Sequence, residues 1–259
     1  MPIVLTEDRG AVRHVVLNRA EKRNAFDDEL VLGLRVALEE AADDPAVHCD
    51  VLRRAGPMFS SGMDVNFLGA LAQEPGRLRA SRRPIIETWN LLEEMPKPTI
   101  AQIHGGCIGG AMELALACDL RVMAADAVIG LVETRVGLVP DVGGSSRLPA
   151  VVGLGRAKEM IMASKLIDGI EAERIGLVNR VAPADELEET TDQLVSELLA
   201  CAPRAVALAK RLLDGVAKPT LSASLELEVT AQELCARSED FAEGTRAFAE
   251  KRQPEFTGR

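Results

Sequence analysis

The chain has 259 residues, a formal net charge of −10 and 47% hydrophobic residues. This composition supplies a full apolar core and excludes a disordered chain, and the acidic balance argues against nucleic acid as the main partner. No apolar run approaches the roughly 18–20 residues that span a bilayer, and the first ten residues lack the parts of a secretory signal. The sequence therefore predicts a cytoplasmic protein without a membrane partner.

The cysteines and histidines are scattered along the chain. The five cysteines are odd in number and lack CxxC spacing, which predicts reduced, mostly buried thiols rather than a disulfide framework or a zinc site. The three histidines are too dispersed for a histidine-based metal site, so no metal is expected. These residues are Cys49, Cys107, Cys118, Cys201, Cys235, His14, His48 and His104.

Apolar periodicity and turn residues define the elements of the first hundred residues. In chain order they are a β-hairpin from residues 3–5 and 12–17, a helix over 29–44, a strand within 49–56, a loop over 57–65 and a helix over 81–95. Residues 7–10, Glu-Asp-Arg-Gly, form the hairpin turn. Asp27 or Asp28 can cap the first helix, and Pro96 and Pro98 end the second.

Strands and helices continue to alternate up to about residue 182. The predicted elements are a strand over 99–103, a helix after the glycine-rich turn at 105–110, strands over 120–125 and 127–130, helices over 155–164 and 171–176, and a strand over 177–182. From Ala184 onward only helical stretches follow, broken near Pro203 and Pro219. This pattern predicts an α/β core with a helical C-terminal extension, and its ββα-like recurrence suits a spiral of similar turns.

The most informative segment is GGCIGGAMELALAC, residues 105–118, in which Glu113 is the only ionisable group apart from thiols. A helix that starts at a glycine-rich turn leaves backbone N–H groups without acceptors. Such donors can stabilise an oxyanion, and burial raises the pKa of a nearby carboxyl toward the range useful for proton transfer. The alternative is a buried Glu113 satisfied by a structural partner.

Five segments occur in a characteristic order, and a sixth closes the chain. They are LNRAEKRNAF (17–26), FSSGMDV (59–65), IHGGCIGGAMELALACDLRV (103–122), ETRVGLVPDVGGSSRLPAVVG (133–153), IGLVNRVA (175–182) and AFAEKRQPEF (247–256). Together they resemble the crotonase superfamily, the enoyl-CoA hydratases and isomerases. The resemblance implies an α/β crotonase-like spiral of ββα turns with a C-terminal helical extension. Residues 1–200 would carry the CoA and catalytic sites, and residues 201–259 would form a helical oligomerisation region.

The resemblance implies an acyl-CoA thioester as substrate, with coenzyme A as part of the substrate and no separate cofactor. The backbone N–H groups of Met63 and Gly110 would hold the thioester oxygen, on which negative charge develops when a proton moves at the neighbouring carbon. For Met63 the alternative is that residues 59–65 form an ordinary surface turn.

Three carboxylates are candidates for proton transfer. By resemblance Glu113 acts on the attacking water and Glu133 on the α-proton, a division of work between two acids; a solvated loop residue is the alternative for Glu133. Asp141 resembles a residue of the dienoyl-CoA isomerases, and the Glu133–Asp141 pair also resembles the 3-hydroxyisobutyryl-CoA hydrolases. Asp141 can instead cap the short helix that begins near Gly143.

Binding of coenzyme A is assigned by resemblance. Arg19, Lys22 and Arg23 lie in the loop that cradles the nucleotide in this superfamily, although a charge run is usually a solvated face. The other residues assigned to CoA are Ser61, Asp64 and Lys251, of which Lys251 would reach the phosphates across a subunit boundary. The resemblance also implies a homotrimer, or a hexamer built as a dimer of trimers.

The interpretation favoured by the sequence is an enoyl-CoA hydratase that adds water across the 2,3 double bond of a 2-enoyl-CoA. The alternatives are an enoyl- or dienoyl-CoA double-bond isomerase that uses Asp141, an acyl-CoA thioester hydrolase, and a non-catalytic CoA-binding protein that keeps the fold. Such non-catalytic proteins commonly lose one or both carboxylates, whereas Glu113 and Glu133 are both present.

Overall fold

The computed structural model describes residues 2–64, 66–67, 69 and 78–258. A six-stranded sheet has the strand order β1-β2-β3-β4-β6-β9, in which only the β1–β2 pair is antiparallel. Its strands are β1 (Val4–Arg9), β2 (Val12–Leu17), β3 (Cys49–Arg54), β4 (Thr99–Ile103), β6 (Leu120–Ala124) and β9 (Arg180–Ala182). The predicted hairpin is confirmed, but the prediction that residues 7–10 form its turn is wrong, because residues 7–9 pair with β2 and the turn consists of Gly10 and Ala11. The later strands of this sheet are confirmed, and they pair in parallel because crossovers rather than tight turns join them.

A second, three-stranded sheet consists of β5 (Gly106–Ile108), β7 (Val128–Gly130) and β8 (Ile167–Asp168). β4 lies in the large sheet and β5, the next strand along the chain, lies in the small sheet and is followed by α4 (Gly110–Ala117). β6 and β7 repeat this arrangement and are followed by α5 (Gly144–Val152). The predicted ββα recurrence is therefore confirmed. The sequence predicted only a turn where β5 lies, because the partners of this strand come from distant segments.

The helices begin and end close to the predicted positions. Asp27, rather than Asp28, is the N-cap of the first helix, and its side chain accepts a hydrogen bond from the Leu30 amide. The other elements that the structure bounds before residue 184 are η1 (Ala20–Lys22), α1 (Asp28–Asp43), α3 (Leu78–Glu94), η3 (Glu133–Val136), α6 (Leu154–Met162) and α7 (Gly169–Arg174). α4 is buried along its whole length, so the carboxyl group of Glu113 lies inside the molecule.

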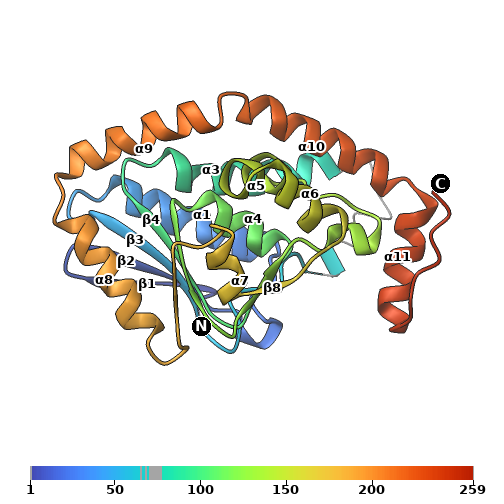
Figure 1. The fold of residues 1–259 in the computed structure, drawn as a ribbon, viewed down its shortest axis with the longest axis horizontal. Coiled ribbons are helices and arrows are strands. Elements are labelled where there is room, and N and C mark those ends of the chain that lie inside the picture. Colours follow the sequence, from blue (N-terminus) through green and yellow to red (C-terminus); the bar gives the residue numbers. More distant parts are fainter. Residues whose placement is uncertain (1, 65, 68, 70–77, 259) are drawn as a thin grey trace.

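Four helices end the chain: α8 (Leu187–Leu199), α9 (Pro203–Ala217), α10 (Leu221–Ala236) and α11 (Glu239–Glu250). α8 packs against the large sheet, and α10 packs against α3 and α5. α9 and α10 follow one another along one long edge, and α11 turns away at its end (Figure 1). None of the described helices is long and apolar enough to cross a membrane, and all five cysteines are free thiols, three of them buried.

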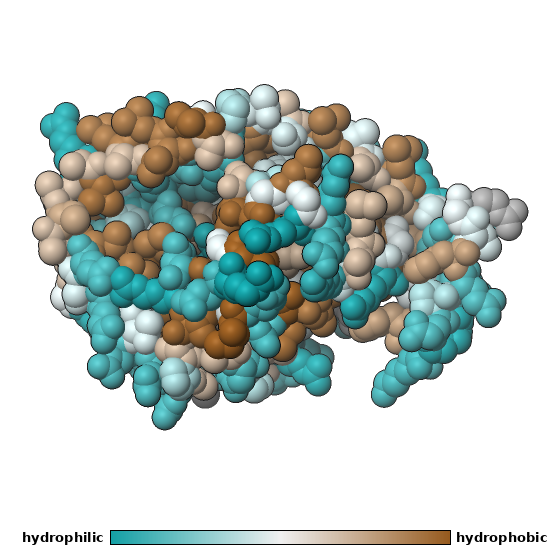
Figure 2. All heavy atoms as spheres, in the orientation of Figure 1, coloured by the Kyte–Doolittle hydropathy of each residue, from teal (hydrophilic) through white to brown (hydrophobic). Residues whose placement is uncertain are grey.

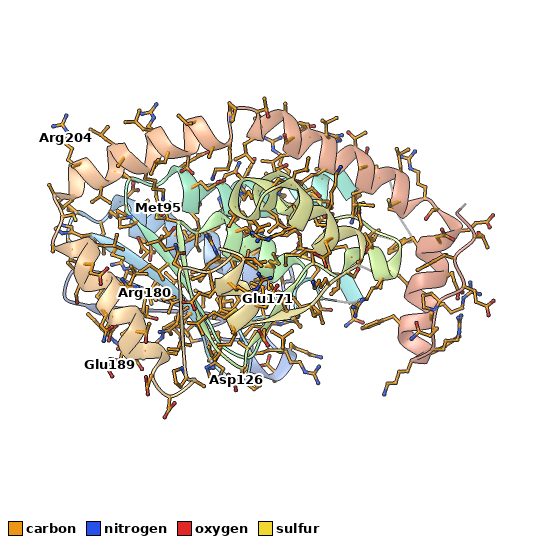
Figure 3. All side chains as sticks on the ribbon, viewed as in Figure 1. Met95, Asp126, Glu171, Arg180, Glu189 and Arg204 are labelled. Carbon is orange, nitrogen blue, oxygen red and sulfur yellow. The ribbon has the colours of Figure 1, made fainter. Side chains whose placement is uncertain are left out.

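The outer face of α9 is apolar. Leu208, Leu212, Leu213 and Val216 are 54–82% exposed, and hydrophobic atoms line the edge that α9 forms in Figure 2. Arg204, at the start of the same helix, points away from the body of the molecule (Figure 3). Other apolar residues of the C-terminal part, such as Leu194 and Leu225, are buried within this chain. Exposed apolar side chains also occur on α10 and α11, where Leu227, Leu234 and Phe248 are 63–71% exposed. α9 differs from these helices in having no buried residue.

Candidate active site

Two of the predicted segments lie side by side because their backbones pair. The Ser60 amide donates to the Gly106 carbonyl at 3.1 Å, and the Ile108 amide donates to the Ser60 carbonyl at 3.2 Å. Gly62 has φ +86°, and a Cβ atom there would lie 2.5 Å from the Ile108 carbonyl oxygen. Only glycine fits this approach. Phe59 and Ser60 are fully buried, so the interpretation of residues 59–65 as a surface turn is wrong for this part of the loop.

This pairing brings the Met63 and Gly110 amides together. A Cβ atom on Gly110 would lie 3.8 Å from the Met63 amide nitrogen. Among the described residues, neither of these two N–H groups donates to a protein acceptor. The Gly110 amide is unpaired because α4 begins at this residue, and the first N–H groups of a helix have no partner within it. Two adjacent free amides are the donor pair that an oxyanion needs.

Glu113 lies on the first turn of α4 and is 2% exposed. Its Oε1 atom accepts hydrogen bonds from the Val142 amide at 3.0 Å and the Gly144 amide at 2.8 Å, so a structural partner is indeed present. No described donor bonds its Oε2 atom, which leaves that oxygen available to a substrate or a water. Burial raises the pKa of Glu113 well above its ordinary value, and the charges of Glu133 and Asp141 raise it further.

Glu133 begins η3 and faces the start of α4. Gly109 has φ +59°, and a Cβ atom there would lie 2.9 Å from Oε1 of Glu133. The other oxygen, Oε2, is buried without a hydrogen-bond partner among the described residues. Burial raises the pKa of Glu133 to about 7, and an acid with such a pKa can both release and accept a proton near neutral pH. Glu133 is therefore not a solvated loop residue.

Asp141 forms a buried ion pair with Arg82 of α3, from Oδ2 to Nε. The exposed fractions are 4% for Asp141 and 1% for Arg82. The prediction that Asp141 caps the following helix is wrong, since the N-cap of α5 is Gly143 and has no side-chain cap bond. The first amides of α5 already donate to Glu113 and Glu228, and Asp141 instead pairs with the guanidinium of Arg82. Burial raises the pKa of Asp141, and the charge of Arg82 opposes this rise.

Two buried charged residues next to the site were not predicted. Arg82 gave no signal, because it stands in a run with Arg79 and Arg83, and the Arg83 side chain is 80% exposed. Glu228 of α10 did carry a signal, since it falls at helical spacing on the buried face of α10, three residues after Leu225. An acidic residue on an apolar face indicates a specific partner, and for Glu228 the partners are amides at the start of α5.

The loop assigned to coenzyme A is organised around Arg19. Its guanidinium bonds Asp64 at 2.9 Å and Asp27 at 2.8 Å, so Arg19 and Asp64 neutralise each other and tie this loop to the Met63 turn. Although burial acts to raise it, the pKa of Asp64 is lowered by bonds from the Asn66 amide and from Arg19. Arg19 is thus already engaged by two carboxylates.

The other residues assigned to coenzyme A lie in two places. Lys22 and Arg23 are exposed, and the Ser61 amide donates to the Arg23 carbonyl at 3.0 Å, so these three residues are neighbours. Lys251 is exposed at the C-terminal end of α11. Among the described residues, no hydrogen bond or ion pair joins Lys251 to the loop over 19–23. A joint role for Lys251 and this loop therefore stays a prediction.

Comparison with known proteins agrees with this geometry. The family model described as enoyl-CoA hydratase/isomerase matches residues 7–259. The chain belongs to the enoyl-CoA hydratase/isomerase family. The crotonyl-CoA hydratase of Syntrophomonas wolfei is 34% identical, over 98% of this chain and 96% of that protein. The putative enoyl-CoA hydratase/isomerase YngF of Bacillus subtilis is also 34% identical, over 94% of each chain.

Solved structures support the same assignment. An enoyl-CoA hydratase from Mycobacterium avium subsp. paratuberculosis has a TM-score of 0.88 at 30% identity, over 98% of both chains. The chain therefore has the fold of the crotonase enzymes, and it is an enzyme of the enoyl-CoA hydratase/isomerase kind. Both hydratases and isomerases occur among the names of its relatives.

Proposed function

We propose that this protein is an enoyl-CoA hydratase that adds water across the 2,3 double bond of a 2-enoyl-CoA thioester. The observation that carries this proposal is the meeting of two unpaired amides, on Met63 and Gly110, with two buried carboxyl groups, on Glu113 and Glu133. This addition requires hydrogen-bond donors that stabilise negative charge on the thioester oxygen and acid–base groups that transfer protons.

The amides would hold the thioester oxygen. When hydroxide adds to the β-carbon, the electron pair of the double bond moves toward the carbonyl and places negative charge on its oxygen. Two preformed N–H donors stabilise this enolate, and the loss of one such donor typically costs about 3–4 kcal/mol of transition-state stabilisation. The backbone pairing of Ser60 with Gly106 and Ile108 supports a rigid arrangement of these donors.

The two glutamates would divide the proton transfers. Ionised Glu113 takes a proton from the attacking water, and protonated Glu133 gives its proton to the α-carbon, so that one proton enters and one leaves the carboxyl pair. The raised pKa values of both groups support a part for each in proton transfer, since two neighbouring buried carboxylates do not ionise easily together.

A panel of CoA esters tests this proposal. The purified protein is incubated with 2-enoyl-, 3-enoyl-, 3,5-dienoyl- and 3-hydroxyacyl-CoA, and the products are separated by chromatography. We expect 3-hydroxyacyl-CoA from the 2-enoyl ester, and the reverse reaction from the 3-hydroxyacyl ester. Double-bond migration without hydration would instead support the isomerase alternative, and release of free CoA would support a thioester hydrolase.

Substitution of Asp141 distinguishes the hydratase proposal from the isomerase alternative. Because Arg82 bonds the Asp141 carboxylate, we expect Asp141→Asn to slow hydration by less than about threefold, while weakening the buried pair and lowering the melting temperature. The measurement is the rate on 2-enoyl- and 3,5-dienoyl-CoA for both proteins. A wild-type enzyme that isomerises the dienoyl ester, together with a variant that only hydrates, would assign proton transfer to Asp141.

The apolar face of α9 supports assembly into a trimer or a hexamer. Leu212 and Val216 are 71% and 82% exposed, and large exposed apolar patches mark interfaces between proteins. We expect light scattering to give the mass of three or six chains, and the double substitution Leu212→Asp/Val216→Asp to give a smaller species. The control is Leu32→Asp, at an exposed residue of α1, which should leave the mass unchanged. A monomeric wild-type protein at micromolar concentration would contradict this prediction.

A further inference from the structure

The C-terminal helix α10 reaches the loop before α5 with two buried polar side chains. Glu228 is 5% exposed and Gln232 is 1% exposed. The Gln232 side-chain oxygen accepts a hydrogen bond from the Val139 amide at 2.9 Å. Glu228 accepts from the Gly143 amide at 2.7 Å and from both the amide and the hydroxyl of Ser146, each at 2.5 Å. α10 therefore fixes this loop at both of its ends.

The same loop holds Glu113. The amides of Val142 and Gly144 donate to Glu113, whereas the amide of Gly143, which lies between them, donates to Glu228. Successive backbone donors thus alternate between two buried carboxylates at the N-terminus of α5, the end of a helix that favours negative charge. A movement of this turn away from Glu228 would also change the bonds to Glu113.

We infer that Glu228 is a positioning residue that acts through Glu113. By fixing the first turn of α5, Glu228 keeps the Val142 and Gly144 amides on Oε1 of Glu113, and this leaves Oε2 of Glu113 directed at the reacting water. Helix α10 thereby determines the orientation of an acid–base group from a much earlier part of the chain. This inference rests on the proposed function for the chemistry assigned to Glu113.

The substitution Glu228→Gln tests the inference. Glutamine keeps the size of the side chain, but its one carbonyl oxygen cannot accept from both Gly143 and Ser146 as the carboxylate does. We expect kcat to fall about tenfold, the size of effect typical for residues that act through another group, while KM changes less than about twofold. Burial raises the pKa of the Glu228 carboxyl to about 7, so assays are run from about pH 6 to about pH 9, and the ratio of wild-type to variant kcat should be largest where this carboxyl is ionised.

A double-mutant cycle with Glu113→Gln distinguishes action through Glu113 from a general effect on the fold. If Glu228 acts through Glu113, then Glu228→Gln costs about tenfold in the wild-type background and nothing further when Glu113 is already glutamine. An equal loss in both backgrounds would overturn the inference, and so would an unchanged kcat in the folded single variant.

Two neighbouring serines provide a milder, matched pair of variants in case Glu228→Gln fails to fold. Ser146→Ala removes one hydrogen bond to Glu228, whereas Ser145→Ala removes a 3.3 Å bond to the Pro140 carbonyl. We expect only Ser146→Ala to lower kcat, by about threefold. Equal effects of the two substitutions would contradict the inference. Glu226→Gln, at an exposed residue of the same helix, should not alter turnover.

Failure of this inference can be told apart from failure of the proposed function. The cycle uses whichever ester of the panel the wild-type protein converts, so an isomerase would still report on Glu228. A second readout needs no turnover: the Glu113 carboxyl, identified by ¹³C NMR from its loss in Glu113→Gln, is titrated in both proteins. Glu113 faces Glu133, Asp141 and Glu228, and removal of the Glu228 charge should lower its pKa. An unchanged titration would overturn the contact on which the inference depends.

Discussion

Replacement of Glu133 by glutamine is expected to reduce turnover by about 100-fold or more, the usual contribution of a general acid or base. Glutamine preserves the shape of the side chain but can no longer exchange a proton with the substrate. Because Oε2 of Glu133 has no described hydrogen-bond partner, little native structure depends on its charge. We therefore expect the melting temperature to stay near the wild-type value, and Glu113→Gln to give a loss of similar size.

The effect of pH on stability provides an independent check on Glu133. Its pKa is about 7 in the folded protein and ordinarily 4.5, so between these values the folded state binds more protons than the unfolded state. The wild-type protein should thus lose stability as pH rises through this window. The free energy of unfolding of Glu133→Gln should fall less between about pH 5 and about pH 8. Nearly full activity of either glutamine variant on every ester would refute the two-carboxylate assignment.

Replacement of Arg82 by methionine is expected to lower the free energy of unfolding by about 3–5 kcal/mol, the cost of removing one partner of a buried ion pair. Asp141 would be left as a buried carboxylate close to two other acids. Urea denaturation measures this loss. The cost should be smaller at low pH, because a protonated Asp141 needs no counterion.

Two further variants test the physical reason for this loss. Arg83→Met changes the next residue of α3, whose side chain is 80% exposed and pairs with Glu87 on the surface, and it should cost less than about 1 kcal/mol. The double substitution Arg82→Met/Asp141→Asn removes both charges, so it should recover part of the stability lost in Arg82→Met. Similar losses for the substitutions at positions 82 and 83 would show that the buried pair does not stabilise the fold.

Local patterns predicted most elements of the core and the burial of Glu113. Strands and helices of the core follow from apolar periodicity, and the glycine-rich turns mark where two backbones meet closely. The burial of Glu113 agrees with this local prediction, whereas the approach of Met63 to Gly110 was expected only from the resemblance to the crotonase superfamily. The elements and the burial of Glu113 are visible in the sequence because each depends on a short segment.

The features that the sequence did not predict depend on contacts between distant segments. Arg82 and Asp141 are 59 positions apart, and Glu228 and Gly143 are 85 positions apart. An N-cap for Asp141 was a sound expectation from local propensity, but the amides at the start of α5 are taken by Glu113 and Glu228. Which carboxylate takes which donor is decided by packing, and a single sequence carries little information about that choice.

The pairing of residue 60 with β5 has a consequence for which substitutions the region around the donor amides can accept. Adjacent paired backbones lie about 4.8 Å apart whatever side chains they carry, so the separation of the two donor amides is set by main-chain hydrogen bonds. Side chains such as those of Met63 and Ile108 are then free to vary without displacing these amides. Substitutions of side chains in these two segments can therefore change the surroundings of the donor amides while the main-chain bonds that place them remain.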